Sequence, residues 1–299
     1  MERNKNKKFI FILGIVTLLL AGIWVWKISS WLLQLPKNFS FQANIVSIDN
    51  FFNQEKGVYS GGSYSKTLYR YETVSSDNKT SIIKNVFRVR TPDDEPIFSV
   101  ERLYGIDRET GAHIANLGDK NRQGYLFAPK KLKPGDAYTY WHINYDAPAQ
   151  MAFVSEEVLY GLPVFRYEAR YKGVKIDQTE NLKFLPDVGT KFGITVDPYL
   201  QLWIEPTTGR LVKYSDDTVA YYYDLATGQR LNPWNHFSNT FEENSVKINA
   251  QNISREKSKI VAIEWYVPIL LIAFGLMVIT TGIGLGETRL IKVLKNKIP

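Results

Sequence analysis

Carboxylates are the side chains in this sequence with the clearest potential for chemistry. Adjacent acids occur at Asp93-Asp94-Glu95, at Glu156-Glu157 and at Asp216-Asp217. Two carboxylates can cleave a glycosidic bond, but such pairs meet in space from separated positions of the chain. Adjacent acids on a loop or strand are usually solvated. We therefore expect no catalytic residue, and an envelope hydrolase using Asp216, Asp217, Glu156 and Glu157 is the weakest alternative.

Metal and nucleophile chemistry has little support in the sequence. The three histidines, His113, His142 and His236, are far apart, and no carboxylate is spaced with them as a metal partner. The chain has no cysteine, which excludes disulfides, thiolate metal sites and cysteine nucleophiles. The sequence contains no GxSxG, no HExxH and no phosphate-binding glycine loop. We expect a non-enzymatic protein without metal or cofactor.

Aromatic residues are the one compositional excess. Tyr138, Tyr140, Trp141 and Tyr145 lie close together in the segment AYTYWHINYDAPA. Amphipathic rings suit the recognition of a sugar or of a lipid at a boundary between water and an apolar phase. These four residues are the candidate ligand-binding residues, and the alternative is that they form strand core.

The positive charge belongs to the ends of the chain. The net charge is +7, yet residues 36–258 hold 27 Lys+Arg and 27 Asp+Glu. A nucleic-acid-binding protein needs a basic stripe, and the neutral middle of this chain predicts none. We expect no nucleic-acid partner.

Two apolar segments predict membrane spans. Residues 9–26 form an uncharged stretch of about 27 Å at the helical rise, and residues 265–286 form a second. Bulky aromatic residues follow the first segment where a signal peptidase site would need small ones. The aromatic residues that we expect at the membrane interface are Trp24, Trp26, Trp31, Trp265 and Tyr266.

Basic residues outside both spans predict the orientation. Four bases precede the first span and four follow the second. The positive-inside rule places both tails in the cytoplasm and the middle outside it. Thr17 and Ala21 in the first span, and Gly282 and Gly286 in the second, have the small-xxx-small spacing that permits close helix pairing.

The middle of the chain has the pattern of antiparallel strands. Thr, Tyr, Val and Phe dominate short runs that Gly, Asp and Pro separate. The expected strands are 67–74, 80–90, 97–106, two within 150–173 around Gly161, 199–204, 210–216 and 218–225. Near residue 240 the period becomes helical, and Thr240-x-x-Glu243 resembles a capping box.

One turn motif occurs three times. In IDRETGAHI, IEPTTGRLV and YDLATGQRL an acid stands four residues before a glycine, and Thr stands directly before it. We expect a tight hairpin at each, with the glycine left-handed and the acid bonding backbone N–H groups. A calcium loop needs more acids at alternate positions than these segments hold. The glycines are Gly111, Gly209 and Gly228.

The order of these features resembles a known family. The segments GYLFAPKKLKPGDAYTYWHINYD, VLYGLPVFRYEARY and LWIEPTTGRLVKY, between two anchors, are similar to those of the porin PorA-like family of two-pass bacterial envelope proteins. The resemblance implies an envelope role and no known catalytic residue. The family name implies a pore, which two helices and one domain do not make without oligomerisation.

The expected fold is a membrane-anchored, mainly antiparallel β (β-rich α+β) extracytoplasmic domain flanked by two transmembrane helices. Its expected function is to bind a lipid, glycolipid or glycan of the envelope, with the lipid bilayer and envelope proteins as partners. The alternatives are an assembly partner of an envelope complex, an envelope hydrolase or an oligomeric pore. The expected segments are a cytoplasmic tail 1–8, a span 9–26 with its helix extending to 35, a domain 36–258 ending in a helix from about 240, a span 265–286 and a basic cytoplasmic tail 287–299.

Overall fold

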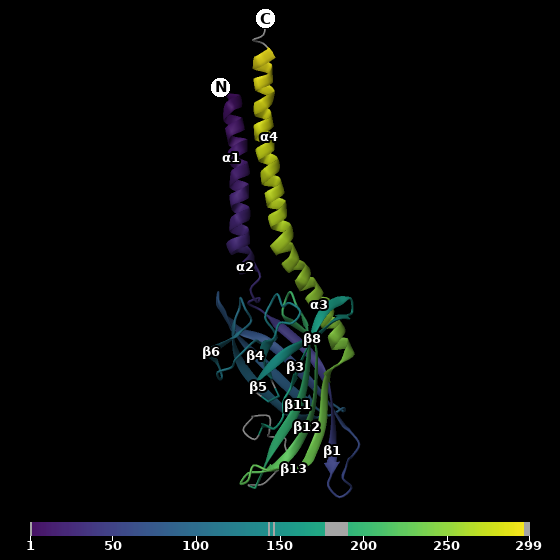
Figure 1. Cartoon of the computed structure of the whole chain (residues 1–299). Helices are drawn as coiled ribbons and strands as arrows, with labels where there is room; N and C mark the ends of the chain where they lie inside the picture. Colours follow the sequence, from purple (N-terminus) through teal and green to yellow (C-terminus); the bar gives the residue numbers. More distant parts are fainter. Residues whose placement is uncertain (1, 143, 146, 177–190, 296–299) are drawn as a thin grey trace. The chain divides into compact units, whose positions relative to one another are not determined.

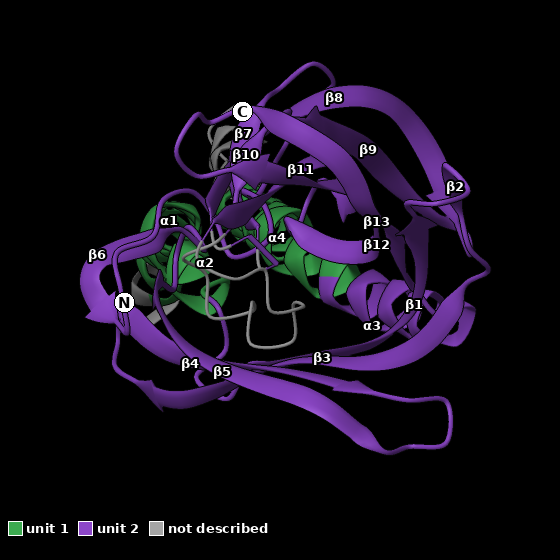
Figure 2. Cartoon of the chain, turned by 90° about the horizontal axis from the view of Figure 1, so that it is seen from below, with its two compact units in different colours: residues 1–34, 257–299 green, residues 35–256 purple. Residues whose placement is uncertain are grey.

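The computed structural model describes residues 2–142, 144–145, 147–176 and 191–295. It divides into two compact units, which Figure 2 colours separately. Unit 1 comprises Met1–Gln34 and Lys257–Pro299, and unit 2 comprises Leu35–Glu256.

Unit 1 is a pair of long apolar helices, as the sequence predicts. The first consists of α1 (Glu2–Ile23), a π-helical turn (Trp24–Ile28) and α2 (Ser29–Leu32). In the second, a π-helical turn (Ala262–Tyr266) leads into α4 (Val267–Lys295). Both are long and apolar enough to cross a membrane (Figure 1). Many of their apolar side chains are exposed, as a lipid-facing surface requires.

Small residues bring the two helices of unit 1 into close contact. Thr17 and Ala21 are buried, as their spacing suggests. At Gly14 a Cβ atom would lie 2.5 Å from Cγ1 of Ile279 and 2.9 Å from the carbonyl oxygen of Gly275. A methyl group at Gly14 would force the helices apart, so glycine sets their separation. The side chains beyond Ile283, including the position of Gly286, lie outside the described residues.

A tryptophan bonds the second helix where a proline interrupts its hydrogen bonding. In the π-helical turn each N–H bonds the carbonyl five residues earlier, as Val267 does to Ala262. Pro268 follows and has no N–H to offer the carbonyl of Ile263. The indole Nε1 of Trp24 donates to that oxygen at 2.9 Å. Trp24 therefore joins the two helices.

Unit 2 is built on a single antiparallel sheet, which confirms the expected fold class. The strand order is β6-β5-β4-β3-β1-β13-β12-β11-β9-β8-β7, with β2 beside β1 and β10 beside β11. The strands are β1 (Ser40–Asn53), β2 (Val58–Tyr59), β3 (Ser63–Ser76), β4 (Thr80–Arg90), β5 (Pro96–Asp107), β6 (His113–Gly118), β7 (Tyr138–His142), β8 (Ala147–Leu159), β9 (Leu162–Arg170), β10 (Val174–Lys175), β11 (Phe192–Glu205), β12 (Arg210–Asp224) and β13 (Arg230–Phe241). The helix α3 (Glu243–Val261) follows β13.

The two ends of this sheet meet through one short segment. Tyr125 forms an antiparallel bridge to Ala112, which directly precedes β6, and a parallel bridge to Tyr140 in β7. Its N–H donates to the carbonyl of Thr139 at 3.0 Å, and the N–H of His113 donates to that of Gly124 at 2.8 Å. The sheet therefore closes into a barrel, and Figure 2 shows its strands around a ring.

Aromatic side chains fill much of the barrel interior. Along β12 the buried residues alternate with more exposed ones, as in a strand with one face on the core. The hydroxyls of Tyr69 and Tyr71 bond at 2.6 Å, and that of Tyr140 lies 3.4 Å from Tyr69. The larger inward-facing aromatic residues are Tyr69, Tyr71, Tyr104, Tyr138, Tyr140, Tyr167, Tyr214 and Phe241.

Two local predictions are wrong. The expected strands 210–216 and 218–225 are one strand, β12, which continues through Asp217. Asp217 does not end it because its side chain faces outward and contacts His236. The capping box at Thr240 is also wrong, because β13 extends to Phe241 and the helix begins at Glu243. The hydroxyl of Thr240 instead donates to the carbonyl of Tyr214.

Candidate functional site: a basic pocket at two hairpin turns

The four candidate aromatic residues lie in or next to β7. Tyr138, Tyr140 and Tyr145 are buried inside the barrel, and Trp141 is half-buried with its ring 6.3 Å from that of His113. Tyr145 stacks on His142 with ring centroids 4.4 Å apart. These rings form part of the wall and interior, and their role in ligand binding stays a prediction.

The carboxylates named as hydrolase candidates occupy different environments. Asp216 is fully buried, whereas Asp217 and Glu156 are exposed. Glu157 accepts a hydrogen bond from Nε1 of Trp203 at 2.7 Å and lies 3.4 Å from Arg166. These contacts indicate that Glu157 has a structural role on the strand surface.

Asp216 is the centre of a buried polar cluster. Its carboxylate accepts hydrogen bonds from Thr218 at 2.6 Å and from Tyr214 and Asn144 at 3.2 Å. Burial raises the pKa of Asp216 to about 6 despite these donors. His142 lies 3.7 Å away, and burial together with the charge of Arg102 lowers its pKa to about 3. The cluster therefore pairs a carboxyl group with a neutral imidazole, held by hydrogen bonds.

The other two histidines are separate from this cluster. Burial, with the charge of Arg122, lowers the pKa of His113 to about 3. His236 contacts Asp217 on the outer face at 2.6 Å. Among the residues that the structure describes, no three His, Asp or Glu side chains are grouped to hold a metal ion.

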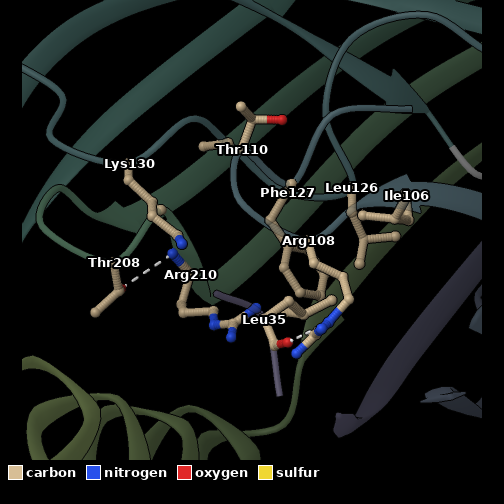
Figure 3. A pocket seen from close by; sticks show the side chains of 12 residues that line it. Leu35, Ile106, Arg108, Thr110, Leu126, Phe127, Lys130, Thr208 and Arg210 are labelled. Carbon is tan, nitrogen blue, oxygen red and sulfur yellow. Dashed lines mark hydrogen bonds between the residues drawn. The ribbon is translucent and has the colours of Figure 1, made fainter. Parts of the chain in front are cut away.

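A pocket of about 340 Å³, including the solvent at its mouth, lies where two of the three turns of the repeated motif meet (Figure 3). Thr110 and Gly111 come from the turn after β5, and Thr208 and Gly209 from the turn between β11 and β12. The apolar part of the lining is Leu35, Ile106, Leu126, Phe127 and Ala128.

The motif folds as expected in both turns. The side chain of Asp107 accepts from the N–H of Thr110 at 2.7 Å, and that of Glu205 accepts from the N–H of Thr208 at 2.8 Å. The glycines after these threonines have φ of 78° and 69°. Three basic residues, Arg108, Lys130 and Arg210, complete the lining of the pocket.

Arg108 is buried without a carboxylate among its hydrogen-bond acceptors. Its Nε donates to the carbonyl of Leu35 at 2.9 Å, and its Nη1 donates to the carbonyls of Asp77 at 2.8 Å and Asn78 at 3.2 Å. These bonds hold the start of unit 2 against the β3–β4 turn. They engage Nε and Nη1 of the guanidinium, whose charge also interacts with the carboxylate of Asp77.

Arg210 and Lys130 lie together on the other side of the pocket (Figure 3). Arg210 binds Glu256 of α3 through Nε at 3.1 Å and Nη2 at 2.9 Å, and its guanidinium lies 4.6 Å from the ring centre of Phe39. The ammonium of Lys130 donates to the carbonyl of Glu109 at 2.9 Å. Burial and the charge of Arg210 lower the pKa of Lys130 to about 8.

Sequence reasoning did not identify this pocket. The available signal was the motif itself, because a basic residue follows the acid in the first turn and the glycine in the second, at Arg108 and Arg210. The two turns are about a hundred residues apart in the sequence, and only closure of the barrel brings them together. Lys130 carried no sequence signal.

A closed antiparallel barrel joined to two helices that could span a membrane defines a class of membrane-associated β-rich proteins. The family model described as Porin PorA matches residues 8–283, so the chain belongs to that family. No curated protein matches the chain.

Proposed function

We propose that this chain is a two-pass envelope protein whose unit 2 lies outside the cytoplasm and binds a lipid or glycolipid at the basic pocket. The carrying observation is that one pocket combines an apolar lining with Arg108, Lys130 and Arg210. An amphiphile has both an apolar part and a polar head, and such a lining complements both.

The sequence neighbours of the pocket support an envelope ligand. Leu35 follows the interfacial Trp31 by four residues, and Glu256, which binds Arg210, precedes Trp265 by nine. Near each end of unit 2, a residue at the pocket is therefore close in sequence to a segment that we expect to contact lipid.

Native mass spectrometry of the full chain, extracted from its membrane in detergent, tests the ligand. Thr110→Trp places a large side chain at the pocket mouth, where Thr110 is exposed. Thr227→Trp is the matched control, because Thr227 has the same place in the third turn of the motif. We expect wild type and Thr227→Trp to keep a lipid mass through delipidation and Thr110→Trp to lose it. Equal retention by all three proteins, or none by wild type, would contradict binding at this pocket.

Labelling of single cysteines tests the orientation, and the absence of native cysteine makes the background low. Asn6→Cys reports the N-terminal tail, and Lys56→Cys reports an exposed turn of unit 2. An impermeant maleimide applied to whole cells should label Lys56→Cys alone, since the basic tails favour the cytoplasm. Labelling of Asn6→Cys in intact cells would reverse the proposed orientation.

A further inference from the structure

The inner face of the barrel changes character toward the end of β1. Ala43 and Ile45 on this face belong to the apolar core, and Asp49 and Phe51 follow them at the same alternation. Phe51 pairs directly with Asn235 of β13, so their side chains lie on one face of the sheet. Phe51 is 43% exposed. This end of the sheet therefore presents polar and aromatic side chains on a face that solvent reaches.

Three aromatic rings gather beside this pair. The ring centroid of Trp234 lies 6.1 Å from that of Phe51 and 6.5 Å from that of Tyr222. Trp234 and Tyr222 are half-buried, because they pack against a small apolar cluster that includes Val196 and Ala220. This packing holds the two rings in place and leaves part of their surface open to a ligand.

Asp49 and Asn235 leave hydrogen-bond acceptors at the same place. Asn235 is 2% exposed, and its Nδ2 donates to the carboxylate of Asp49 at 2.8 Å. Its Oδ1 is buried without a hydrogen-bond partner in the part of the chain that the structure describes. A buried acceptor without a donor is costly, so a ligand that donates hydrogen bonds would relieve that cost.

Amide side chains continue this polar surface next to Trp234. Nε2 of Gln54 donates to the carbonyl of Pro233 at 3.0 Å, and Nδ2 of Asn232 donates to Oε1 of Gln54 at 2.7 Å. Both amide side chains belong to exposed residues. An amide both donates and accepts hydrogen bonds, as binding to a hydroxyl group requires.

These groups select among classes of ligand. An anion without N–H or O–H groups would satisfy no acceptor here and would be repelled by the carboxylate of Asp49. A quaternary ammonium ion suits aromatic rings, but it has no N–H to donate to Asn235. A sugar has hydroxyl groups that donate and apolar C–H faces that pack on aromatic rings. The combination of rings, amides and one carboxylate therefore fits a sugar best.

We infer that this end of the barrel is a glycan site, in which Asp49 and Asn235 accept hydrogen bonds from the hydroxyl groups of a neutral glycan. Phe51, Tyr222 and Trp234 contact the faces of its sugar rings. The glycan site shares no residue with the basic pocket, so the inference goes beyond the proposed function. Glycan binding and lipid retention are measured separately, and either proposal can fail alone.

Saturation-transfer NMR on the full chain in phosphatidylcholine nanodiscs tests the site, because it detects weak binding of small ligands. The probes are neutral oligosaccharides of glucose, mannose, galactose, arabinose and N-acetylglucosamine, and empty nanodiscs give the background. We expect at least one probe to receive saturation from the protein and to give a measurable Kd on titration. Absence of transfer to all five probes would overturn the inference.

Three variants locate the binding. Phe51→Ala should weaken it roughly threefold to tenfold, because an aromatic contact is lost at an exposed position that does not disturb the core. Asp49→Asn should weaken it roughly tenfold or more, because a charged acceptor bonds a hydroxyl more strongly than a neutral one. Tyr64→Ala is the matched control, since Tyr64 is 58% exposed and lies opposite Ile48 on the other face of the sheet.

Melting temperatures close to that of wild type establish that the variants fold. Unchanged affinity in both Phe51→Ala and Asp49→Asn, or an equal loss in Tyr64→Ala, would overturn the glycan site. Tetramethylammonium separates a sugar from an organic cation, and we expect no saturation transfer to this ion. Transfer to tetramethylammonium that Asp49→Asn abolishes, with no sugar bound, would assign the site to a cation and contradict the inference.

Discussion

The second and third turns of the repeated motif have the same local structure in different surroundings. In the second, Glu205 accepts from the N–H of Thr208, whose hydroxyl accepts from the N–H of Arg210. In the third, Asp224 and Thr227 make the equivalent bonds. Their glycines have φ of 69° and 71°. Local sequence therefore determines the turn itself.

The two turns differ in the segment of the chain that packs against each of them. A Cβ atom on Gly209 would lie 2.5 Å from the carbonyl oxygen of Ala128, whereas one on Gly228 would meet nothing within 4 Å. The N–H of Leu132 bonds the carbonyl of Pro206 at 3.0 Å. The segment 126–132 thus converts one copy of a common turn into a pocket wall, and the third copy stays a surface loop.

The largest expected effect comes from replacing the buried glycine. Gly209→Ala combines left-handed strain of about 1 kcal/mol with a backbone clash of about 1–3 kcal/mol. Gly228→Ala carries only the strain, about 1 kcal/mol. Thermal unfolding of the full chain should show a clearly larger decrease in melting temperature for Gly209→Ala. Equal decreases would mean that the segment 126–132 moves aside without cost.

Removing the acidic side chain should also destabilise the second turn more than the third, with a smaller difference in the free energy of unfolding. Glu205→Ala leaves the buried N–H of Thr208 without its acceptor, which costs about 1–3 kcal/mol. Glu205→Gln retains an acceptor oxygen and should keep most of the stability. Asp224→Ala should have less effect than Glu205→Ala, because water reaches the exposed turn. Denaturant unfolding measures the loss in the free energy of unfolding for each variant. A larger loss for Asp224→Ala than for Glu205→Ala would contradict this order.

The same contrast explains which features the sequence could predict. Thr80–Arg90 was predicted to the residue, and all three turns were found, because strand alternation and turn chemistry are local. The closure of the barrel at Tyr125 depends on partners from β6 and β7 that no local pattern encodes. The pocket depends on that closure.

Strand β12 shows a further limit of local reasoning. Adjacent aspartates are poor strand formers, so Asp216-Asp217 predicts a break. Within the barrel, Asn144 donates to Asp216 on the inner face, and His236 contacts Asp217 on the outer face. Long-range partners outweigh the intrinsic preference here, and a single sequence does not reveal them.

The smallest expected effect is electrostatic and concerns the charge of Asp224 in the exposed third turn. The N–H and hydroxyl of Thr227 hold the pKa of Asp224 below its usual value of 3.8, so ionised Asp224 stabilises the folded state. That contribution is present above pH 3.8 and is lost as pH falls through the lowered pKa. Asp224→Asn keeps an acceptor but lacks the charge, so it should melt slightly below wild type at pH 7. The two melting temperatures should converge as the medium is acidified below the pKa of Asp224, whereas a gap of constant size would show that the charge adds nothing to this turn.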